Sequence, residues 1–207
     1  MNYKHYILTR FNYPDDYPHL EERFKIFYNF TKPSFEAQTN TNFTWFILIN
    51  PHHEKLFQPF KNINVELVPK WDVYQSPTDY LLTSRVDCDD VLHQDYVSTI
   101  QELFLQDQST RVIDGPGYRY VNKTKEVYTY YTRYSKRTTS PFSTLVAPFR
   151  DKLTVMCEKH GSLPQRFKVQ FHDKKLWLQH IHDYNILMRG VGEKKINLDL
   201  KNFNINL

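Results

Sequence analysis

The chain has 207 residues, of which 40% are hydrophobic, a size and composition that suit one compact domain with its own core. Its formal charge of +4 comes from 27 Lys and Arg against 23 Asp and Glu and is spread along the sequence. This balance fits a small anionic ligand, whereas nucleic-acid binding would need a denser basic patch. No apolar run reaches membrane-spanning length, and the first residues lack the apolar core of a signal peptide.

The two cysteines, Cys88 and Cys157, are too few for a disulfide framework and favour a reducing compartment. We therefore expect a cytoplasmic protein. The 5 Gly and 11 Pro form no low-complexity linker, so residues 1–207 are expected to make a single domain.

The first half of the chain predicts strands that alternate with helices. Residues 3–9 predict a strand whose polar, cationic end, Thr9 and Arg10, suits a nucleotide. A helix is expected over residues 20–30, then a break at 31–35 and a second short helix that carries Gln38.

The next strands continue this alternation. The apolar run at residues 45–49 is typical of a strand buried on both faces of a parallel sheet. A helix at 52–60, a more exposed strand at 63–68, a buried strand at 79–86 and a helix from Tyr96 follow. This order predicts an α/β arrangement through residue 105, with right-handed crossovers.

Three carboxylates, Asp87, Asp89 and Asp90, follow the strand at 79–86. Ligands of open α/β sheets bind at the carboxyl ends of strands. Asp87 and Asp89 are two residues apart, so both can converge on one hard cation where the strand becomes a loop, and Arg85 offers a planar fork to a phosphate. The group suggests binding of a diphosphate. The alternative is a set of turn and capping residues, and we expect Asp90 to cap the helix that follows.

After residue 105 the pattern favours antiparallel strands. Residues 111–121 and 126–134 predict two of them, joined by a polar turn. A helix is expected over 148–160, with Pro148 in its first turn and Gly161 just past its end. Further strands are expected at 166–172 and 176–182, and the alternating tail, Ile196, Leu198 and Leu200, is expected to dock on the body.

An α/β half with D-x-D at a strand end, followed by a mixed half, resembles the GT-A nucleotide-sugar glycosyltransferases. Five segments in the same order also resemble the putative rhamnosyltransferase family of GT-A-like proteins: residues 6–12, 33–38 running into 43–51, 83–93, 140–146 and 177–185. The fold implied is a GT-A-like α/β domain with a mixed central sheet. Its parallel nucleotide-binding half, flanked by helices, lies in residues 1–105 as the donor half, and a smaller antiparallel part with the tail lies in residues 106–207 as the acceptor half.

The sequence departs from the family pattern at three positions. An acidic residue is common where Cys88 stands, a Glu where Ala147 stands and a Gly where Asp183 stands. The middle residue of D-x-D need not touch a metal, so the first departure is tolerable. Loss of a carboxylate at Ala147 affects the acceptor side, so the donor half of the site transfers better.

The resemblance implies a metal-dependent glycosyltransferase that moves a sugar, rhamnose by the family name, from a nucleoside diphosphate to a hydroxyl of a glycan or glycoprotein. Negative charge builds on the diphosphate as it leaves, and Mn²⁺ or Mg²⁺ bridging the phosphates stabilises it. A UDP- or dTDP-sugar is the expected donor. We expect no nucleic-acid partner and no membrane span, and the chain is a candidate module of a longer multidomain enzyme.

The site residues follow from this chemistry. Asp89 is expected to bind the metal directly, and Asp87 to contact the ribose, or the metal through water. The resemblance adds His182 as a late metal ligand, since imidazole accepts manganese readily, although a strand-end histidine can equally be structural, as we expect for His180. The residues expected to contact the nucleotide sugar are Thr9 at the base pocket, Arg10, Gln38, Arg85 and Asp87.

An inverting enzyme also needs a carboxylate base. Asp151 is one candidate, because it lies near the start of the helix expected at 148–160 and off its apolar stripe; its alternative role is a partner of the helix dipole. Asp114, beside Gly115, is the other candidate, with a turn residue as its alternative. A retaining enzyme would need no such base, and both courses stay open.

Two other classes remain. A metal-dependent phosphohydrolase can use D-x-D at a strand end, but an aspartyl-nucleophile phosphatase normally has it on the first strand. A non-catalytic sugar- or nucleotide-binding module would keep the fold without needing the metal, so its ligand affinity would survive Asp89→Ala.

Overall fold

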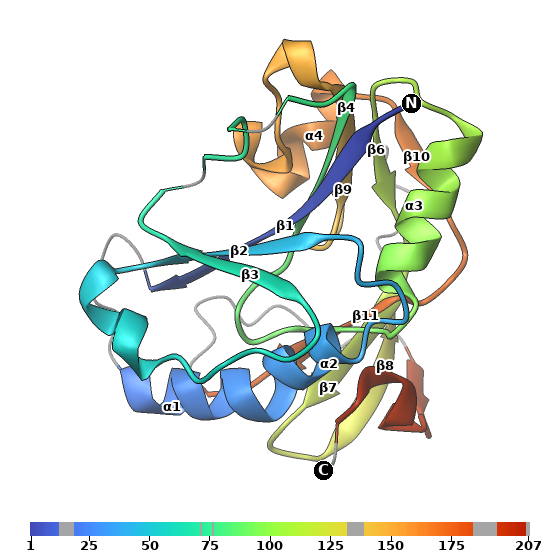
Figure 1. Ribbon diagram of the computed structural model, residues 1–207. Helices are drawn as coiled ribbons and strands as arrows, with labels where there is room; N and C mark the ends of the chain where they lie inside the picture. Colours follow the sequence, from blue (N-terminus) through green and yellow to red (C-terminus); the bar gives the residue numbers. More distant parts are fainter. Residues whose placement is uncertain (13–18, 71, 76, 132–138, 184–193, 206–207) are drawn as a thin grey trace.

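The structure is a computed structural model that describes residues 1–12, 19–70, 72–75, 77–131, 139–183 and 194–205. Within these residues the chain forms two mixed sheets, the larger in the upper part of Figure 1 and the smaller below it. None of the described helices is long and apolar enough to cross a membrane.

The larger sheet has the order β10-β6-β9-β4-β1-β2-β3. Strands β4, β1, β2 and β3 run parallel, β9 runs antiparallel to both β4 and β6, and β10 is parallel to β6. The strands are β1 (Tyr3–Asn12), β2 (Thr44–Ile49), β3 (Asn64–Val68), β4 (Tyr80–Arg85), β6 (Arg111–Asp114), β9 (Thr144–Pro148) and β10 (Val169–Phe171).

The smaller sheet has the order β12-β8-β7-β11-β5. Its pairs are antiparallel except β7 with β11. The strands are β5 (Val91–Leu92), β7 (Gly117–Val121), β8 (Glu126–Tyr130), β11 (Trp177–Ile181) and β12 (Lys194–Ile196). The expected α/β class is therefore confirmed, with a mixed central sheet whose four neighbouring parallel strands, β4, β1, β2 and β3, come from the first half of the chain. The division into donor and acceptor halves stays a prediction.

The longer helices cover one face of the larger sheet, and a short helix with 3-10 turns covers the other. The α-helices are α1 (Leu20–Ile26), α2 (Lys32–Glu36), α3 (Tyr96–Gln106) and α4 (Leu163–Arg166), with a π-helical segment η1 (Phe27–Thr31) between α1 and α2. The 3-10 turns are η2 (Pro51–Leu56), η3 (Phe149–Asp151), η4 (Val155–Cys157), η5 (His160–Ser162) and η6 (Leu200–Phe203).

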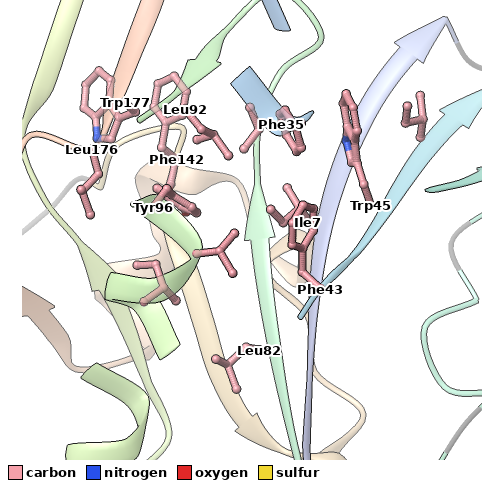
Figure 2. Close-up of a cluster of buried hydrophobic side chains, with 14 of the residues drawn as sticks. Ile7, Phe35, Phe43, Trp45, Leu82, Leu92, Tyr96, Phe142, Leu176 and Trp177 are labelled. Carbon is pink, nitrogen blue, oxygen red and sulfur yellow. The ribbon is translucent and has the colours of Figure 1, made fainter. Parts of the chain in front are cut away.

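The main core is aromatic and runs through both sheets. Phe35 of α2 stacks on Trp45 of β2 at 3.6 Å between ring centroids, and Phe142 stacks on Trp177 of β11 at 4.3 Å. Figure 2 shows this cluster extending from Trp45 to Trp177 past Ile7 and Leu92. One core therefore packs the two sheets together. A second cluster on the opposite face of the larger sheet includes Leu8.

Several predicted elements have other forms. The break expected at residues 31–35 is wrong: the helix from Leu20 continues through the wider π turns to Glu36, and Pro33 lies in the first turn of α2, directly after the π turns. The helix expected at 52–60 is only the 3-10 turn η2. The tail docks as expected, since Leu198 and Leu200 pack on buried residues of the smaller sheet.

The helix expected over 148–160 is wrong. Pro148 ends strand β9, whose residues Leu145, Val146 and Ala147 are fully buried between β4 and β6. Lys152 then has a positive φ of 51°, which a right-handed helix cannot contain. The apolar residues of this stretch pack from separate 3-10 turns instead. Of the strand expected at 126–134, residues 132–134 lie outside the described residues, as do 184–185 of the last resembling segment.

Gly117 tests the contact between β7 and β11. A Cβ at this position would lie 2.2 Å from the Trp177 ring, whose Nε1 donates to Gly115 O, so Gly117→Ala must displace the indole. We expect a loss of about 1–3 kcal/mol in unfolding free energy, the usual cost of overpacking. Gly161→Ala is the matched control, because no atom lies within 4 Å of its added Cβ. Urea titration of both variants measures the difference, and equal stability would contradict this packing.

His5 predicts a pH dependence of stability. The ring is buried on β1, its Nε2 is hydrogen-bonded to Ser84 Oγ at 2.8 Å, and burial lowers the pKa of His5 to about 3. Below the unfolded pKa of about 6.5 the unfolded chain binds a proton that the native chain does not, so stability falls as the pH falls. We expect the stability difference between wild type and His5→Gln to shrink by about 1.4 kcal/mol from pH 7.5 to 5.5 in urea titrations. A constant difference would show that His5 takes up a proton as readily in the fold as in the unfolded chain.

Candidate functional site

The carboxyl ends of β1 and β4 meet at one edge of the larger sheet. The two strands are parallel, with Leu8 opposite Arg85, and Val86 N continues the ladder by donating to Leu8 O at 3.2 Å. Arg10, which is exposed, therefore lies at the same edge as Arg85. This is the edge where the sequence places a nucleotide, and the D-x-D residues follow directly.

Contacts of Cys88 with the helical segment of residues 20–36 hold the loop after β4 in place. The Cys88 side chain is buried, and burial raises the pKa of its thiol well above the usual value. Thr31 Oγ1, at the end of the π segment, donates to Cys88 O at 2.8 Å, and Arg23 of α1 donates to Cys88 Sγ at 3.7 Å. The middle residue of D-x-D thus anchors the loop on the helix, while Asp87 and Asp89 stay partly exposed.

The two outer carboxylates of D-x-D have different partners. Asp87 Oδ1 accepts hydrogen bonds from Nε and Nη2 of Arg85, at 3.3 and 3.1 Å. Asp89 Oδ2 lies 2.9 Å from Nε2 of His182, which follows β11. The side chains of Asp89 and His182 are 21% and 5% exposed, so the contact opens to solvent on the Asp89 side. The structure therefore brings Arg85, Asp87, Asp89 and His182 to the same loop.

Asp90 does not cap α3, which corrects the expectation from the sequence. Its side chain is buried and Oδ1 accepts a hydrogen bond from the backbone N–H of His180 at 3.0 Å. Burial, followed by the charges of Asp89 and Asp87, raises the pKa of Asp90 well above its usual value, and the bond from His180 opposes that rise. The cap position belongs to Asp95, directly before Tyr96. Asp90 thus fastens the loop to β11, a role that sequence reasoning missed. The position of Asp95, directly before the helix, was the signal that Asp90 is not the cap.

His180 lies under the site as a buried neutral ring. Burial, and then the neighbouring His182, lowers the pKa of His180 to about 4. The ring stacks on Phe30 of η1 at 4.2 Å, and neither ring nitrogen has a hydrogen-bond partner among the described residues. Its placement in the interior agrees with a structural role.

Arg119 of β7 adds a cation that sequence reasoning missed. Its Nε donates to Gln179 Oε1 at 2.9 Å, and the guanidinium lies 3.9 Å from the centre of the Tyr130 ring. Burial lowers the pKa of Arg119, while the charges of Tyr130 and Asp90 act in the opposite direction. The signal available in the sequence was an arginine between two tyrosines, Tyr118 and Tyr120, on a predicted strand.

Two residues expected to contact the nucleotide sugar lie in the interior instead. Thr9 is fully buried, and its Oγ1 accepts a hydrogen bond from Trp45 Nε1 at 2.9 Å. Gln38 donates to Ser34 O at 3.0 Å and to His93 O at 2.9 Å, and its Oε1 accepts from Val97 N at 3.1 Å. Both polar groups are satisfied within the protein, so Thr9 supports β2, and Gln38 joins α2 to α3.

Neither candidate base is placed to act at the D-x-D loop, because Asp151 lies far from it and Asp114 is hydrogen-bonded to another residue. Asp151 follows β9, whose Pro148 pairs with Tyr80 at the start of β4. The six residues of β4 span about 20 Å, so Asp151 lies at the opposite edge from Asp87. Asp114 is buried at the end of β6, where its carboxylate accepts hydrogen bonds from Ser140 N at 2.9 Å and Ser140 Oγ at 2.5 Å. It holds the loop before β9.

The donor set fits a divalent cation in part. Among the described residues, no group of three or more His, Cys, Asp and Glu side chains is arranged to hold a metal. Asp89 and His182 nevertheless place a carboxylate oxygen and an imidazole nitrogen side by side, and manganese accepts both. Ions of this kind often take only one or two protein ligands and complete their shell with water and substrate phosphates. The pair is therefore compatible with a metal that arrives with a diphosphate.

Comparison with known families finds one match. Residues 9–64 match the model of a family described as putative rhamnosyl transferase. The resemblance expected from the sequence is confirmed over this stretch. The matched stretch, residues 9–64, contains Arg10 and Gln38, whereas the D-x-D residues lie beyond it. A comparison with curated proteins finds no match.

Among solved structures, the chain is similar to TarS of S. aureus. A structure of TarS 1-349 has 12% identity and a TM-score of 0.46, over 86% of this chain and 60% of that one. The same fragment in complex with UDP has 12% identity and a TM-score of 0.47, with the same coverage. A TarS structure of greater length has 10% identity and a TM-score of 0.46, over 86% of this chain and 37% of that one. The chain thus spans 60% or less of the length of these proteins.

Replacing Gln38 tests whether this residue has a structural role or binds the nucleotide. Gln38→Ala leaves the N–H of Val97 and two carbonyls without their buried partner, so we expect a loss of about 1–3 kcal/mol in unfolding free energy. Nucleotide affinity, measured by calorimetry on the folded variant, should stay unchanged. Gln106→Ala, at an exposed position of α3, is the control. A large loss of nucleotide affinity at full stability would restore Gln38 to the site.

Proposed function

We propose that this chain is a GT-A-like glycosyltransferase module that binds a nucleoside-diphosphate sugar with the help of a divalent cation. The observation that carries the proposal is the contact between Asp89 and His182, beside the Arg85–Asp87 pair at the carboxyl end of β4. The family match over residues 9–64 supports the same class. The family description points to rhamnose as the sugar. Our proposal adds a UDP- or dTDP-sugar as the donor and a hydroxyl of a glycan or glycoprotein as the acceptor.

Cationic side chains at this edge would bind the donor's phosphates. Arg10 is exposed, and Arg85 is held by Asp87, which accepts from two of its nitrogens. A guanidinium fixed in this way keeps its remaining N–H groups for phosphate oxygens at little further entropic cost. Asp87, 37% exposed in its side chain, would contact the ribose.

Asp89 and His182 would hold Mn²⁺ or Mg²⁺. When bound, the ion supplies positive charge that stabilises the diphosphate as it leaves. The protein's part is to orient the two side chains, and Asp90 does this by fixing the loop to the backbone of His180. The thiol of Cys88, buried and held with a raised pKa, stays out of this chemistry.

A non-catalytic nucleotide-sugar-binding module is the second candidate function. The placement of Asp151 at the far edge, and of Asp114 in bonds to Ser140, favours it over an inverting enzyme that uses either residue as base. Sugar transfer from a radiolabelled donor to acceptor glycans distinguishes the two candidates. Donor binding with no transfer or hydrolysis over long incubation would support the binding module.

Metal-dependent nucleotide binding tests the donor site. We expect Asp89→Asn and His182→Ala to weaken UDP or dTDP binding in Mn²⁺ by at least about tenfold, the size of effect typical of losing a metal contact. In chelator the variants should match wild type, because the metal contribution is then gone. Isothermal titration calorimetry measures both conditions.

Asp151→Asn is the matched control for this experiment, since it removes a carboxylate charge at the opposite edge of the sheet. It should bind nucleotide as wild type does. If wild type binds nucleotide equally well in Mn²⁺ and in chelator, the assigned roles of Asp89 and His182 fail.

A further inference from the structure

A cavity of about 360 Å³ lies apart from the D-x-D loop. Four parts of the chain form it: the turn between β5 and α3, strand β7, the residues just before β11, and the C-terminal tail. Its volume falls at the small end of ligand pockets, which run from about 300 to 1,000 Å³. The polar side chains that line it are His93, Asp95, Lys174, Lys175, Asp199 and Asn202.

The walls of this cavity are joined by backbone hydrogen bonds. His93 N donates to Leu176 O, and Gln94 N donates to Asn202 O, both at 2.9 Å. Phe203, which is buried, contacts the ring of His93 edge-on at 5.3 Å between centroids. The cavity is therefore built before any ligand arrives, which lowers the entropic cost of binding.

Side chains on the rim are also held. Asp95 Oδ1 accepts from Thr39 Oγ1 at 3.0 Å, and Lys174 Nζ donates to Thr99 Oγ1 at 3.2 Å. Each keeps further capacity, because a carboxylate accepts several hydrogen bonds and an ammonium donates three. Tyr118 of β7, half-buried, adds an aromatic ring to the lining.

The charges of this lining balance. Lys174 and Lys175 oppose Asp95 and Asp199, so the formal charges cancel with His93 neutral, and burial lowers the pKa of His93. An anion would meet the two carboxylates, and an apolar ligand would leave charged groups desolvated and unpaired. A hydroxyl group both donates and accepts, so a ring that carries several hydroxyls can pair with both kinds of side chain.

We propose that this cavity is a second carbohydrate site, which takes a neutral sugar unit through its hydroxyls. His93 follows Asp90 by three residues, about 10 Å of extended chain, so a short glycan can reach from this cavity to the D-x-D loop. That the bound sugar belongs to the acceptor glycan rests on the proposed function. The binding of a sugar does not.

Saturation-transfer NMR tests the cavity with neutral sugars, starting from methyl rhamnoside, methyl N-acetylglucosaminide and lactose, with inorganic phosphate as a separate probe. We expect saturable binding of a neutral sugar by wild type. Asn202→Ala, which keeps the backbone carbonyl bonded to Gln94, should weaken it about fivefold, the worth of one hydrogen bond. Tyr118→Leu, which removes the ring, should weaken it as well.

Lysine variants separate a sugar from an anion. The double variant Lys174→Gln, Lys175→Gln keeps hydrogen-bond donors but loses both charges, so sugar binding should stay within about twofold of wild type. Asn64→Ala, exposed on the edge strand β3, is the control that should change nothing. Three outcomes would overturn the proposal. The first is a preference of the cavity for phosphate that the double variant abolishes, and the second is the lack of any saturable sugar binding by wild type. The third is an equal sugar affinity for wild type, Asn202→Ala and Tyr118→Leu.

Nucleotide binding measured on the same samples keeps this proposal apart from the proposed function. Asp89→Asn should lose metal-dependent nucleotide binding and keep sugar binding at the cavity. Sugar binding without nucleotide binding in wild type would overturn the donor site alone, and nucleotide binding without sugar binding would overturn the cavity alone.

Discussion

The hydrogen bond from His180 N to Asp90 Oδ1 joins the two sheets at the point where the site forms. Asp89 and His182 are 93 residues apart in sequence, and they meet because their neighbours Asp90 and His180 are fixed to each other. Asp90 is buried, so the bond is protected from competing water. Burial, and then the charges of the neighbouring Asp89 and Asp87, raises the pKa of Asp90, and the backbone N–H of His180 opposes this rise.

The helical segment from Leu20 to Glu36 supplies the second constraint. Its π turns widen the helix where Thr31 bonds to the carbonyl of Cys88 and where Phe30 stacks on His180. One short segment thus supports the D-x-D loop and the end of β11 together. A regular α-helix over the same residues would rotate the residues after the π turns relative to those before them, so the π turns set which side chains of this segment face the loop and β11.

Much of the fold could be predicted from local pattern, because a continuous apolar run such as Trp45–Ile49 fits only a few environments. The stretch after Pro148 could not. Its apolar residues have helical spacing, but they follow a strand buried between two others, and the positive φ of Lys152 directs the chain into separate turns. The elements that pack beside and over a strand come from distant parts of the sequence, and local periodicity carries no information about them.

The positions of some polar residues could also be predicted from local sequence, and those of others could not. Arg85, Asp87 and Asp89 could be placed at one edge from the strand alone. His182 was expected beside them only from the family resemblance, because its contact with Asp89 depends on the pairing of β5 with β11. Sequence alone cannot distinguish a polar side chain that binds a ligand from one that satisfies the backbone, as Gln38 does. Burial makes the distinction. Gln38 is buried and its amide is fully paired within the protein, so it is structural, while the partly exposed Asp87 and Asp89 keep acceptor capacity for a ligand.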